Sequence, residues 1–401
     1  MRYLKHSLVF VLFLLTTLVV LGQKYTVIVS LDGCRWDYPE IYNTPNLNAI
    51  GKQGVKAVMQ PSFPSKTFPN HYTLVTGLTP DHHGIISNNF IDQETNLRFS
   101  LSSKTVKKDP RFWHGEPIWQ TAMRQGLRVG VIYWPGSDIP INLGKTPTPY
   151  PTYYHDYDNP PLLTNAQRLA RLQELLSLPE SERPRLILMY FEEPDHTSHQ
   201  FGPTSVQTKQ VVEQMDSIVG EIRHIIAQTA FPDSINLIVT ADHGMTRLSE
   251  ERKIDIESIL NKSWYDRIWY DLPTMVFPKK GCADKIVRAL QNHPHLRVWK
   301  KNDVPAYLRY GTNPNIGEVV VLPDVGWTIG SRKLRNIGTH GFDPTVQDMH
   351  VPFLAVGPDF KKMYVRTETF PNTDFYNIIC HILGIIPAPN DGTNGSFDVL
   401  E

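Results

Sequence analysis

Short apolar runs and longer amphipathic stretches alternate along the chain. Five runs are apolar on both faces, as expected for strands buried inside a parallel sheet: residues 25–31, 128–133, 186–191, 235–240 and 351–356. Apolar residues recur every three or four positions in three longer stretches, which predicts amphipathic helices at 165–177, 203–228 and 371–383. Alternating strands and helices predict an α/β fold, a doubly wound and mostly parallel sheet flanked by helices.

Two stretches depart from this alternation. Residues 146–161 contain five prolines and four tyrosines with no apolar period, which predicts a surface loop able to offer aromatic rings to a ligand. Residues from about 250 to 335 are expected to form a smaller lobe packed against the main sheet. No repeat or linker divides the chain, so residues 23–401 are predicted to be one catalytic domain that contains this lobe.

The first 22 residues have the composition of a secretory signal. Basic residues near the start precede an apolar stretch that ends near Gly22. An uncleaved membrane anchor is the alternative, although the stretch is shorter than the ~20 residues that a spanning helix needs. We therefore expect an exported protein, periplasmic or secreted, that meets a membrane only if this segment stays attached.

Composition excludes some classes of protein. The 401 residues are 41% hydrophobic, ample for a large core, and the formal net charge is zero. A neutral chain has no electrostatic footprint for nucleic acid, so no duplex partner is expected. Only three cysteines are present, too few for a disulfide framework and without thiolate metal spacing: Cys34, Cys282 and Cys380.

Polar residues with metal-ligand chemistry follow the predicted strands. Asp32 comes directly after the run 25–31, and Asp242 and His243 come directly after 235–240. An adjacent carboxylate and imidazole cannot both point inward from a strand, but they can from the turn that follows it. The alternative is an ordinary loop aspartate beside a solvated histidine.

Asp195 and His199 follow the run 186–191 and are four residues apart, which places both on one face of a helical turn. His196 is expected to point outward. A helix start rich in capping acids is the alternative for this segment. His340 lies in a glycine-flanked turn and would bring Asp195 and His199 to three candidate ligands. With Asp32, Asp242 and His243 this gives two sets of three. Three protein ligands and one open position are typical of hydrolytic zinc sites.

Thr67 precedes a predicted helix that has Pro69 in its first turn and runs to Thr76. As the cap of that helix, its hydroxyl would face the positive end of the helix dipole, where a phosphate is held favourably. A metal ion would lower the pKa of this hydroxyl and make it a nucleophile. The alternative is a structural N-cap only. Lys66 is expected to face solvent.

Eight short segments occur together in order. They are SLDG from Ser30, PSKTFPNHYTLVTG from Pro64, HGIISNN from His83, WPGSD from Trp134, EEPD with His199 from Glu192, ADHGM from Ala241, THGF from Thr339 and PNDGTNGS from Pro389. In order and spacing they resemble the nucleotide pyrophosphatase/phosphodiesterase family of the alkaline phosphatase superfamily. The resemblance covers nearly all of the chain after the signal and corresponds to a minimal catalytic form.

The resemblance implies two Zn²⁺ ions per chain and an alkaline phosphatase-like fold. One ion would be held by Asp195, His199 and His340, and the other by Asp32, Asp242 and His243, the second ion also binding the nucleophile Thr67. Asn88 matches the asparagine that donates to a phosphoryl oxygen. Phe68 and Tyr154 resemble an aromatic clamp for a nucleobase, although Tyr150, Tyr153 and Tyr157 are close alternatives.

Charge favours a diester substrate. Two Zn²⁺ ions bring four positive charges and three carboxylates remove three, which suits a singly charged phosphodiester better than a dianionic monoester. We expect hydrolysis of nucleotide 5′-phosphodiester or pyrophosphate bonds, in ATP or dinucleotides, to a nucleoside 5′-monophosphate through a phosphothreonine. A phospholipid or choline-ester phosphodiesterase, and an inactive metal-binding homologue, are the alternatives; the oligomeric state stays open.

Overall fold

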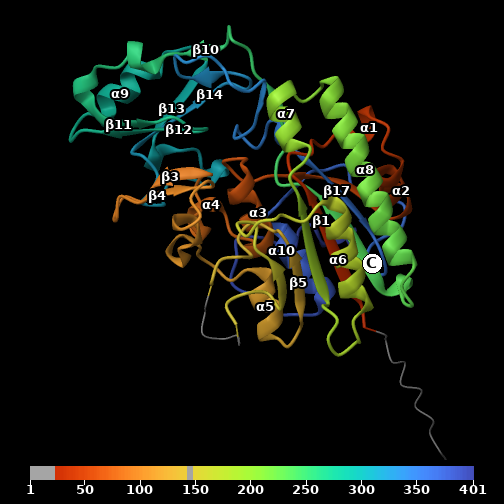
Figure 1. Cartoon of the computed structure of the whole chain (residues 1–401). Coiled ribbons are helices and arrows are strands. Elements are labelled where there is room, and N and C mark those ends of the chain that lie inside the picture. Colours follow the sequence, from red (N-terminus) through yellow and green to blue (C-terminus); the bar gives the residue numbers. More distant parts are fainter. Residues whose placement is uncertain (1–22, 142–147) are drawn as a thin grey trace, which may run out of the picture.

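The computed structural model describes residues 23–141 and 148–401. The signal predicted at 1–22 lies outside them, as do the first two residues of the loop predicted at 146–161. Within the described residues, no helix is both long and apolar enough to cross a bilayer. Figure 1 shows a large body around a central sheet and a smaller lobe to its upper left.

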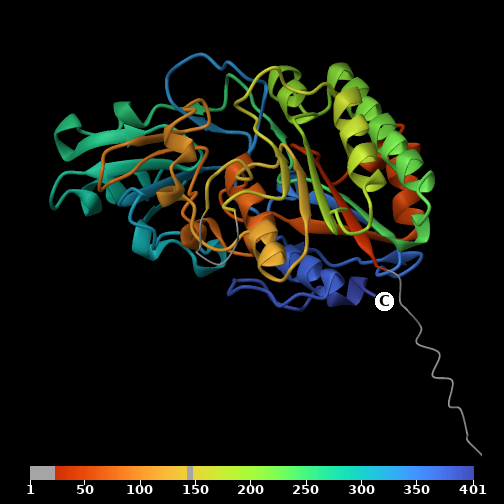
Figure 2. The same ribbon diagram turned by 60° about the horizontal axis from the view of Figure 1, so that its bottom comes forward.

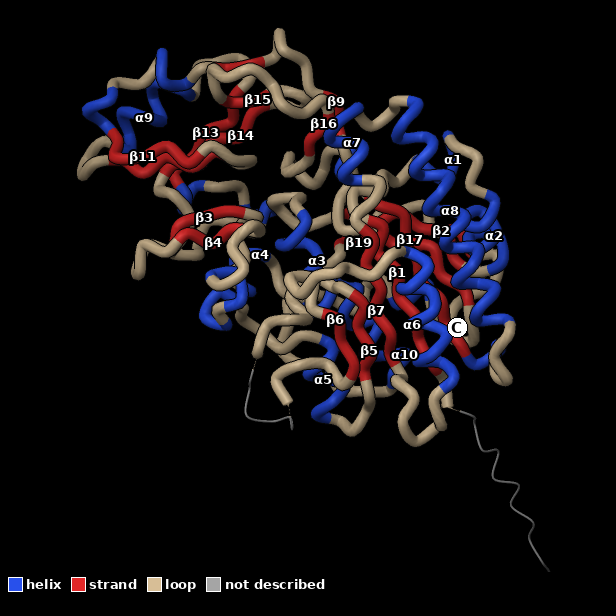
Figure 3. Tube along the Cα trace, viewed as in Figure 1, coloured by secondary structure: helices blue, strands red, loops and turns tan. Residues whose placement is uncertain are grey.

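A nine-stranded sheet forms the centre of the large body, in the order β18-β2-β17-β8-β1-β7-β5-β6, with β19 also paired to β2 (Figure 3). Only β17 runs against the others, antiparallel to both β8 and β2. The predicted fold class, a mostly parallel sheet flanked by helices, is therefore confirmed. The strands are β1 (Tyr25–Leu31), β2 (Val55–Gln60), β5 (Val129–Ile132), β6 (Tyr153–His155), β7 (Leu186–Phe191), β8 (Ile235–Thr240), β17 (Val351–Val356), β18 (Tyr364–Val365) and β19 (Phe370–Pro371).

The strands that are buried on both faces are those that the sequence predicts. Four of the five apolar runs have the bounds of β1, β7, β8 and β17, and the fifth is β5, shorter by one residue at each end. β2 was not predicted, because its buried residues alternate with half-buried ones such as Lys56 and Gln60. The stretch predicted as a loop at 146–161 contains β6, whose backbone pairs with β5 at the sheet edge.

Two layers of helices flank the sheet (Figure 2): α2, α6 and α8 on one side and α3, α5 and α10 on the other. α8 begins later than predicted because the Ser205 hydroxyl caps it, accepting from the N–H of Thr208 at 3.0 Å. α10 begins later because Phe370 and Pro371 extend the sheet instead. The helices are α1 (Tyr38–Ile41), α2 (Pro45–Gln53), α3 (Thr67–Thr76), α4 (Pro80–His83), α5 (Ile118–Arg124), α6 (Asn165–Ser177), α7 (Asp195–Phe201), α8 (Val206–Ala227), α9 (Ala283–Leu290) and α10 (Asp374–Leu383).

The smaller lobe contains a four-stranded antiparallel sheet in the order β11-β12-β14-β13, covered by α9. Its buried residues form a hydrophobic cluster separate from the main core. The strands are β11 (Tyr265–Trp269), β12 (Thr274–Pro278), β13 (Leu296–Lys300) and β14 (Val319–Pro323). Three short two-stranded pairs lie outside these two sheets: β3 (Asn89–Ile91) with β4 (Arg98–Ser100), β9 (Thr246–Arg247) with β16 (Gly338–Thr339), and β10 (Lys253–Ile254) with β15 (Thr328–Ile329). All three cysteines are described, and none is in a disulfide.

Candidate metal centre and active site

Three neighbouring strands end at one edge of the sheet and bring acidic residues together there. β1 lies between β7 and β8, so Asp32, Asp195 and Asp242 follow strands that are side by side. Gly33 permits this approach: its φ is +67°, and a Cβ on it would lie 2.8 Å from the Cβ of Asp195. The backbone N–H of Asp195 donates to the carbonyl of Asp32 at 2.9 Å, and that of Gly33 to Asp242 Oδ1 at 3.2 Å.

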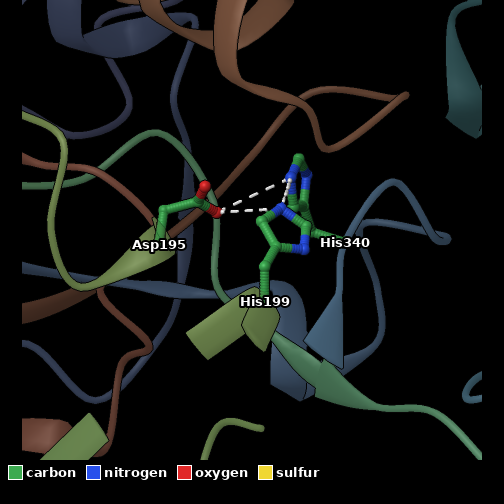
Figure 4. Close-up of side chains that lie close together, drawn as sticks. All are labelled: Asp195, His199 and His340. Carbon is green, nitrogen blue, oxygen red and sulfur yellow. Dashed lines mark hydrogen bonds and ion pairs between the residues drawn. The ribbon is translucent and has the colours of Figure 1, made fainter. Parts of the chain in front are cut away.

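Asp195, His199 and His340 form the first trio (Figure 4). Nε2 of His199 lies 3.4 Å and Nε2 of His340 lies 3.7 Å from Asp195 Oδ1, and the two nitrogens are 3.2 Å apart. On the other side of each ring, Nδ1 bonds a backbone carbonyl, that of Gly338 for His199 and that of Ser65 for His340. A carbonyl oxygen can only accept a hydrogen bond, so Nδ1 of each ring carries the proton. Nε2 therefore presents a lone pair to the centre of the trio.

Asp32, Asp242 and His243 form the second trio, and all three are buried. His243 Nε2 lies 3.0 Å from Asp242 Oδ2 and 3.6 Å from Asp32 Oδ1. Its Nδ1 bonds the Gly244 carbonyl at 2.9 Å, so the same tautomer turns a lone pair inward. Within each trio the candidate ligand atoms all lie within 4.8 Å of one another.

The two trios are adjacent. The rings of His243, from the second trio, and His340, from the first, stack with centroids 3.5 Å apart at 10°. Thr67 lies beside them, with Oγ1 3.1 Å from His243 Nε2. The structure therefore brings the six predicted ligands and the predicted nucleophile into one site.

The chemistry of this donor set fits divalent cations. Asp32 Oδ1, Asp195 Oδ1 and Asp242 Oδ2 are buried without a hydrogen-bond partner, and such orphaned oxygens are costly unless a cation binds them. Burial, followed by the charges of Asp242 and Asp195, raises the pKa of Asp32 well above its usual range, and burial raises the pKa of Asp195. Burial also lowers the pKa of His340 well below 6.5, so this ring is neutral, the form that binds metal. Carboxylate oxygens and imidazole nitrogens are the ligands that Zn²⁺ takes in hydrolytic sites.

Thr67 is not the cap of its helix, contrary to the prediction. It is the first residue of α3, and Lys66 occupies the cap position. The Thr67 hydroxyl contacts His243 instead of a free backbone N–H of α3, which leaves its oxygen facing the trios. Asn88 lies close by: its Oδ1 accepts from the N–H of Phe68 at 3.0 Å, which places the Asn88 amide beside the first turn of α3.

A cavity of about 230 Å³ opens beside Thr67. Its lining joins residues of both trios, Asp32 and Asp195, to the aromatic rings of Phe68 and Tyr157. Tyr154, which the sequence suggested as the second clamp ring, does not line this cavity. It stacks on Tyr150 with centroids 4.9 Å apart. Neighbouring residues of a strand point to opposite faces, so Tyr154 points away from the face on which His155 lines the cavity.

Two further side chains near the trios were not predicted to contribute. The Tyr190 hydroxyl donates to Asp32 Oδ2 at 2.7 Å, and such an outer contact orients a metal ligand. Lys66, expected to face solvent, is only 8% exposed. A tyrosine near the end of an apolar strand has no special signal in the sequence. The contact of Tyr190 with Asp32 follows from the pairing of Ser30 with Tyr190 between β1 and β7.

Known proteins share this arrangement of elements. A family model described as type I phosphodiesterase / nucleotide pyrophosphatase matches residues 26–343. Human ectonucleotide pyrophosphatase/phosphodiesterase family member 5 is 37% identical, over 92% of this chain and 76% of the relative. Bovine family member 3 is 37% identical over 93% of this chain, which spans only 44% of that relative. A solved structure of murine family member 5, an inactive threonine-to-alanine variant in complex with AMP, has a TM-score of 0.86 at 35% identity and covers 94% of this chain and 100% of its own.

Proposed function

The chain belongs to the type I phosphodiesterase / nucleotide pyrophosphatase family, whose members are hydrolases, and from this premise we propose that it is a two-zinc nucleotide phosphodiesterase. Its substrates are nucleotides with a 5′-phosphodiester or pyrophosphate bond, such as ATP and dinucleotides, and one product is a nucleoside 5′-monophosphate. The fold is alkaline phosphatase-like, as in the murine relative. One observation carries the proposal: both trios, Thr67 and an aromatic cavity meet in a single site.

Thr67 is the nucleophile in this proposal. Its Oγ1 attacks phosphorus, a bond forms between the two, and the bond to the leaving oxygen breaks, which leaves a phosphothreonine that water hydrolyses. When bound, the two metal ions neutralise charge on the reacting oxygens and lower the pKa of the threonine hydroxyl. Asn88 donates an Nδ2 hydrogen bond to a non-bridging oxygen, and the N-terminus of α3 favours the negative phosphoryl group.

The charges around Thr67 support a diester rather than a monoester. Two Zn²⁺ ions and three carboxylates leave a net charge of about +1. Lys66 does not add to this charge, because Asp271 pairs with its Nζ at 2.5 Å. A doubly charged monoester would need a further unpaired cation at this position, whereas a diester does not.

The walls of the cavity support a nucleotide over a choline ester. A cage for a quaternary ammonium needs aromatic rings and a free carboxylate. Asp138 lines the cavity, but its carboxylate lies 3.1 Å from Lys108 Nζ. Lys107 also lines the cavity, but Asp158 pairs with its Nζ at 2.8 Å, so it adds no unpaired charge to the wall. The aromatic rings are therefore available for stacking on a nucleobase.

A comparison of three substrates tests the proposal. The zinc-loaded protein is incubated with ATP, a dinucleotide or glycerophosphocholine, and the products are separated by chromatography. We expect AMP from the first two substrates, with kcat/KM at least about a hundredfold above that for glycerophosphocholine. Faster release of phosphocholine than of AMP would replace the nucleotide assignment with the choline-ester one, and no turnover of any substrate would favour the inactive homologue.

Tyr157 is expected to set nucleotide affinity. Stacking on a base contributes about 1–3 kcal/mol, so Tyr157→Ala should raise KM for a nucleotide ester by about five- to a hundredfold and change kcat little. Tyr154→Ala is the matched control, because Tyr154 stacks on Tyr150 outside the cavity. Steady-state kinetics of both variants check this, and a larger KM change in the Tyr154 variant would reverse the assignment.

We also propose export through the segment 1–22, on the evidence of its sequence alone. Detection of the mature N-terminus in the medium or periplasm tests this.

A further inference from the structure

Asp271 extends from the smaller lobe into the neighbourhood of the active site. It lies in the turn between β11 and β12, and its side chain is 16% exposed. Its two carboxylate oxygens have different partners. Oδ1 pairs with Lys66 Nζ at 2.5 Å, and Oδ2 accepts from the Ser87 hydroxyl at 2.7 Å. One carboxylate from the lobe therefore links two segments of the main body.

Each partner directly precedes a residue of the proposed reaction. Lys66 precedes the nucleophile Thr67, and Ser87 precedes Asn88. Both partners are buried, Lys66 at 8% and Ser87 at 1% exposure. The N–H of Phe68 already joins the two segments through Asn88 Oδ1. Asp271 supplies a second, charged link between them, from outside both segments.

Neighbouring contacts hold the turn against these segments. The Trp269 indole N–H donates to the Asn89 carbonyl at 2.9 Å, two residues away from Ser87. Gly341, next to the candidate ligand His340, has a φ of +110°. A Cβ on it would lie 2.9 Å from the Cβ of Leu272 and 3.1 Å from Cε of Lys66. The lack of a side chain at this position lets the lysine stem and the lobe turn approach the site.

We propose that Asp271 is a positioning residue that holds Thr67 and Asn88 at the spacing that phosphoryl transfer requires. This rests on the proposed function. A buried ammonium that loses its partner is strongly unfavourable, so Lys66 would move toward solvent and displace Thr67 with it. A displacement of about 1 Å at a reacting group costs about a hundredfold in rate. The smaller lobe thus contributes to the geometry of the reaction without touching the substrate.

Asp271→Asn is the test variant, because it keeps the size of the side chain and removes its charge. We expect kcat for a nucleotide aryl phosphodiester to fall about ten- to a hundredfold, with KM within about threefold of the wild type and unchanged metal content. Asp324→Asn is the matched control. Asp324 belongs to the same lobe and pairs with His295 at 3.1 Å, away from Lys66 and Ser87, so its rate should stay at the wild-type value.

A double-variant cycle separates positioning from loss of fold. Lys66→Met removes the buried charge, so adding it to Asp271→Asn should restore part of the lost kcat rather than multiply the two losses. An unchanged kcat in Asp271→Asn overturns the proposal. So does a fall in kcat together with lost metal, or one that Lys66→Met does not partly restore, because either would indicate a purely structural role.

A crystal structure of Asp271→Asn distinguishes failure of this inference from failure of the proposed function. An inactive wild-type enzyme would contradict the function alone. The structure of the variant would still decide the positioning role. If Asp271 positions the two segments, the 3.0 Å contact between the Phe68 N–H and Asn88 Oδ1 should be lost in Asp271→Asn. Retention of that contact, with Lys66 in place, would refute the inference whatever the substrate.

Discussion

Replacing Thr67 by alanine is expected to lower turnover of a nucleotide aryl phosphodiester by at least about three orders of magnitude. Its Oγ1 lies 3.1 Å from His243 Nε2, beside both trios and at the mouth of the aromatic cavity. The hydroxyl of Ser65, two residues earlier, donates to the Phe342 carbonyl instead and does not take this position. Release of the coloured leaving group in a continuous assay measures the loss.

Metal content is the second measurement on the Thr67→Ala variant. Six other side chains form the trios, so zinc should stay near two ions per chain, which separates loss of the nucleophile from loss of the metal centre. Thr67→Ser is the matched control. It retains a hydroxyl on the first residue of α3 and should keep measurable activity. Turnover at the wild-type rate in the alanine variant would eliminate Thr67 as the nucleophile.

Replacing His340 by alanine is expected to lower metal occupancy and rate together, each by at least about tenfold at limiting zinc. The variant removes one of three ligand atoms of the first trio and also the ring that stacks on His243 at 3.5 Å. Ligand loss weakens metal binding more than the ten- to hundredfold cost of losing an outer contact. Titration with zinc, followed by elemental analysis after gel filtration, measures the occupancy.

His196→Ala provides the comparison for this variant. His196 lies in α7 between the candidate ligands Asp195 and His199, but it is exposed and belongs to neither trio. Its removal should leave zinc content and rate unchanged. Two tightly bound ions in the His340 variant would contradict the assignment of six ligands.

Sequence patterns predicted the elements that are buried on both sides. β1, β7, β8 and β17 carry apolar side chains on both faces, so their sequences are continuous apolar runs. β2 was missed because only alternate residues are buried, and β6 was missed because its tyrosines face partly toward solvent at the edge. Burial on one side leaves a weaker pattern, and pairing with a neighbour then decides the structure.

Some of the site residues could be predicted from the sequence, and others could not. Asp242 with His243, and Asp195 with His199, could be recognised because each pair is local in the chain and follows a strand. The choice among the tyrosines could not, since the direction of Tyr154 and Tyr157 depends on how β6 pairs with β5. The burial of Lys66 was unpredictable for the same reason, because its partner Asp271 lies in the lobe, far along the chain.

The sequence by itself determined the α/β class, five of the main strands and the residue types suited to two divalent ions. These follow from local periodicity and from polar residues placed after apolar runs, and both are properties of neighbouring positions. Only the tertiary structure decided that His243 and His340 stack, that Tyr157 lines the cavity and that Asp271 links Lys66 to Ser87. These contacts join distant segments through strand order and packing, which no local pattern encodes.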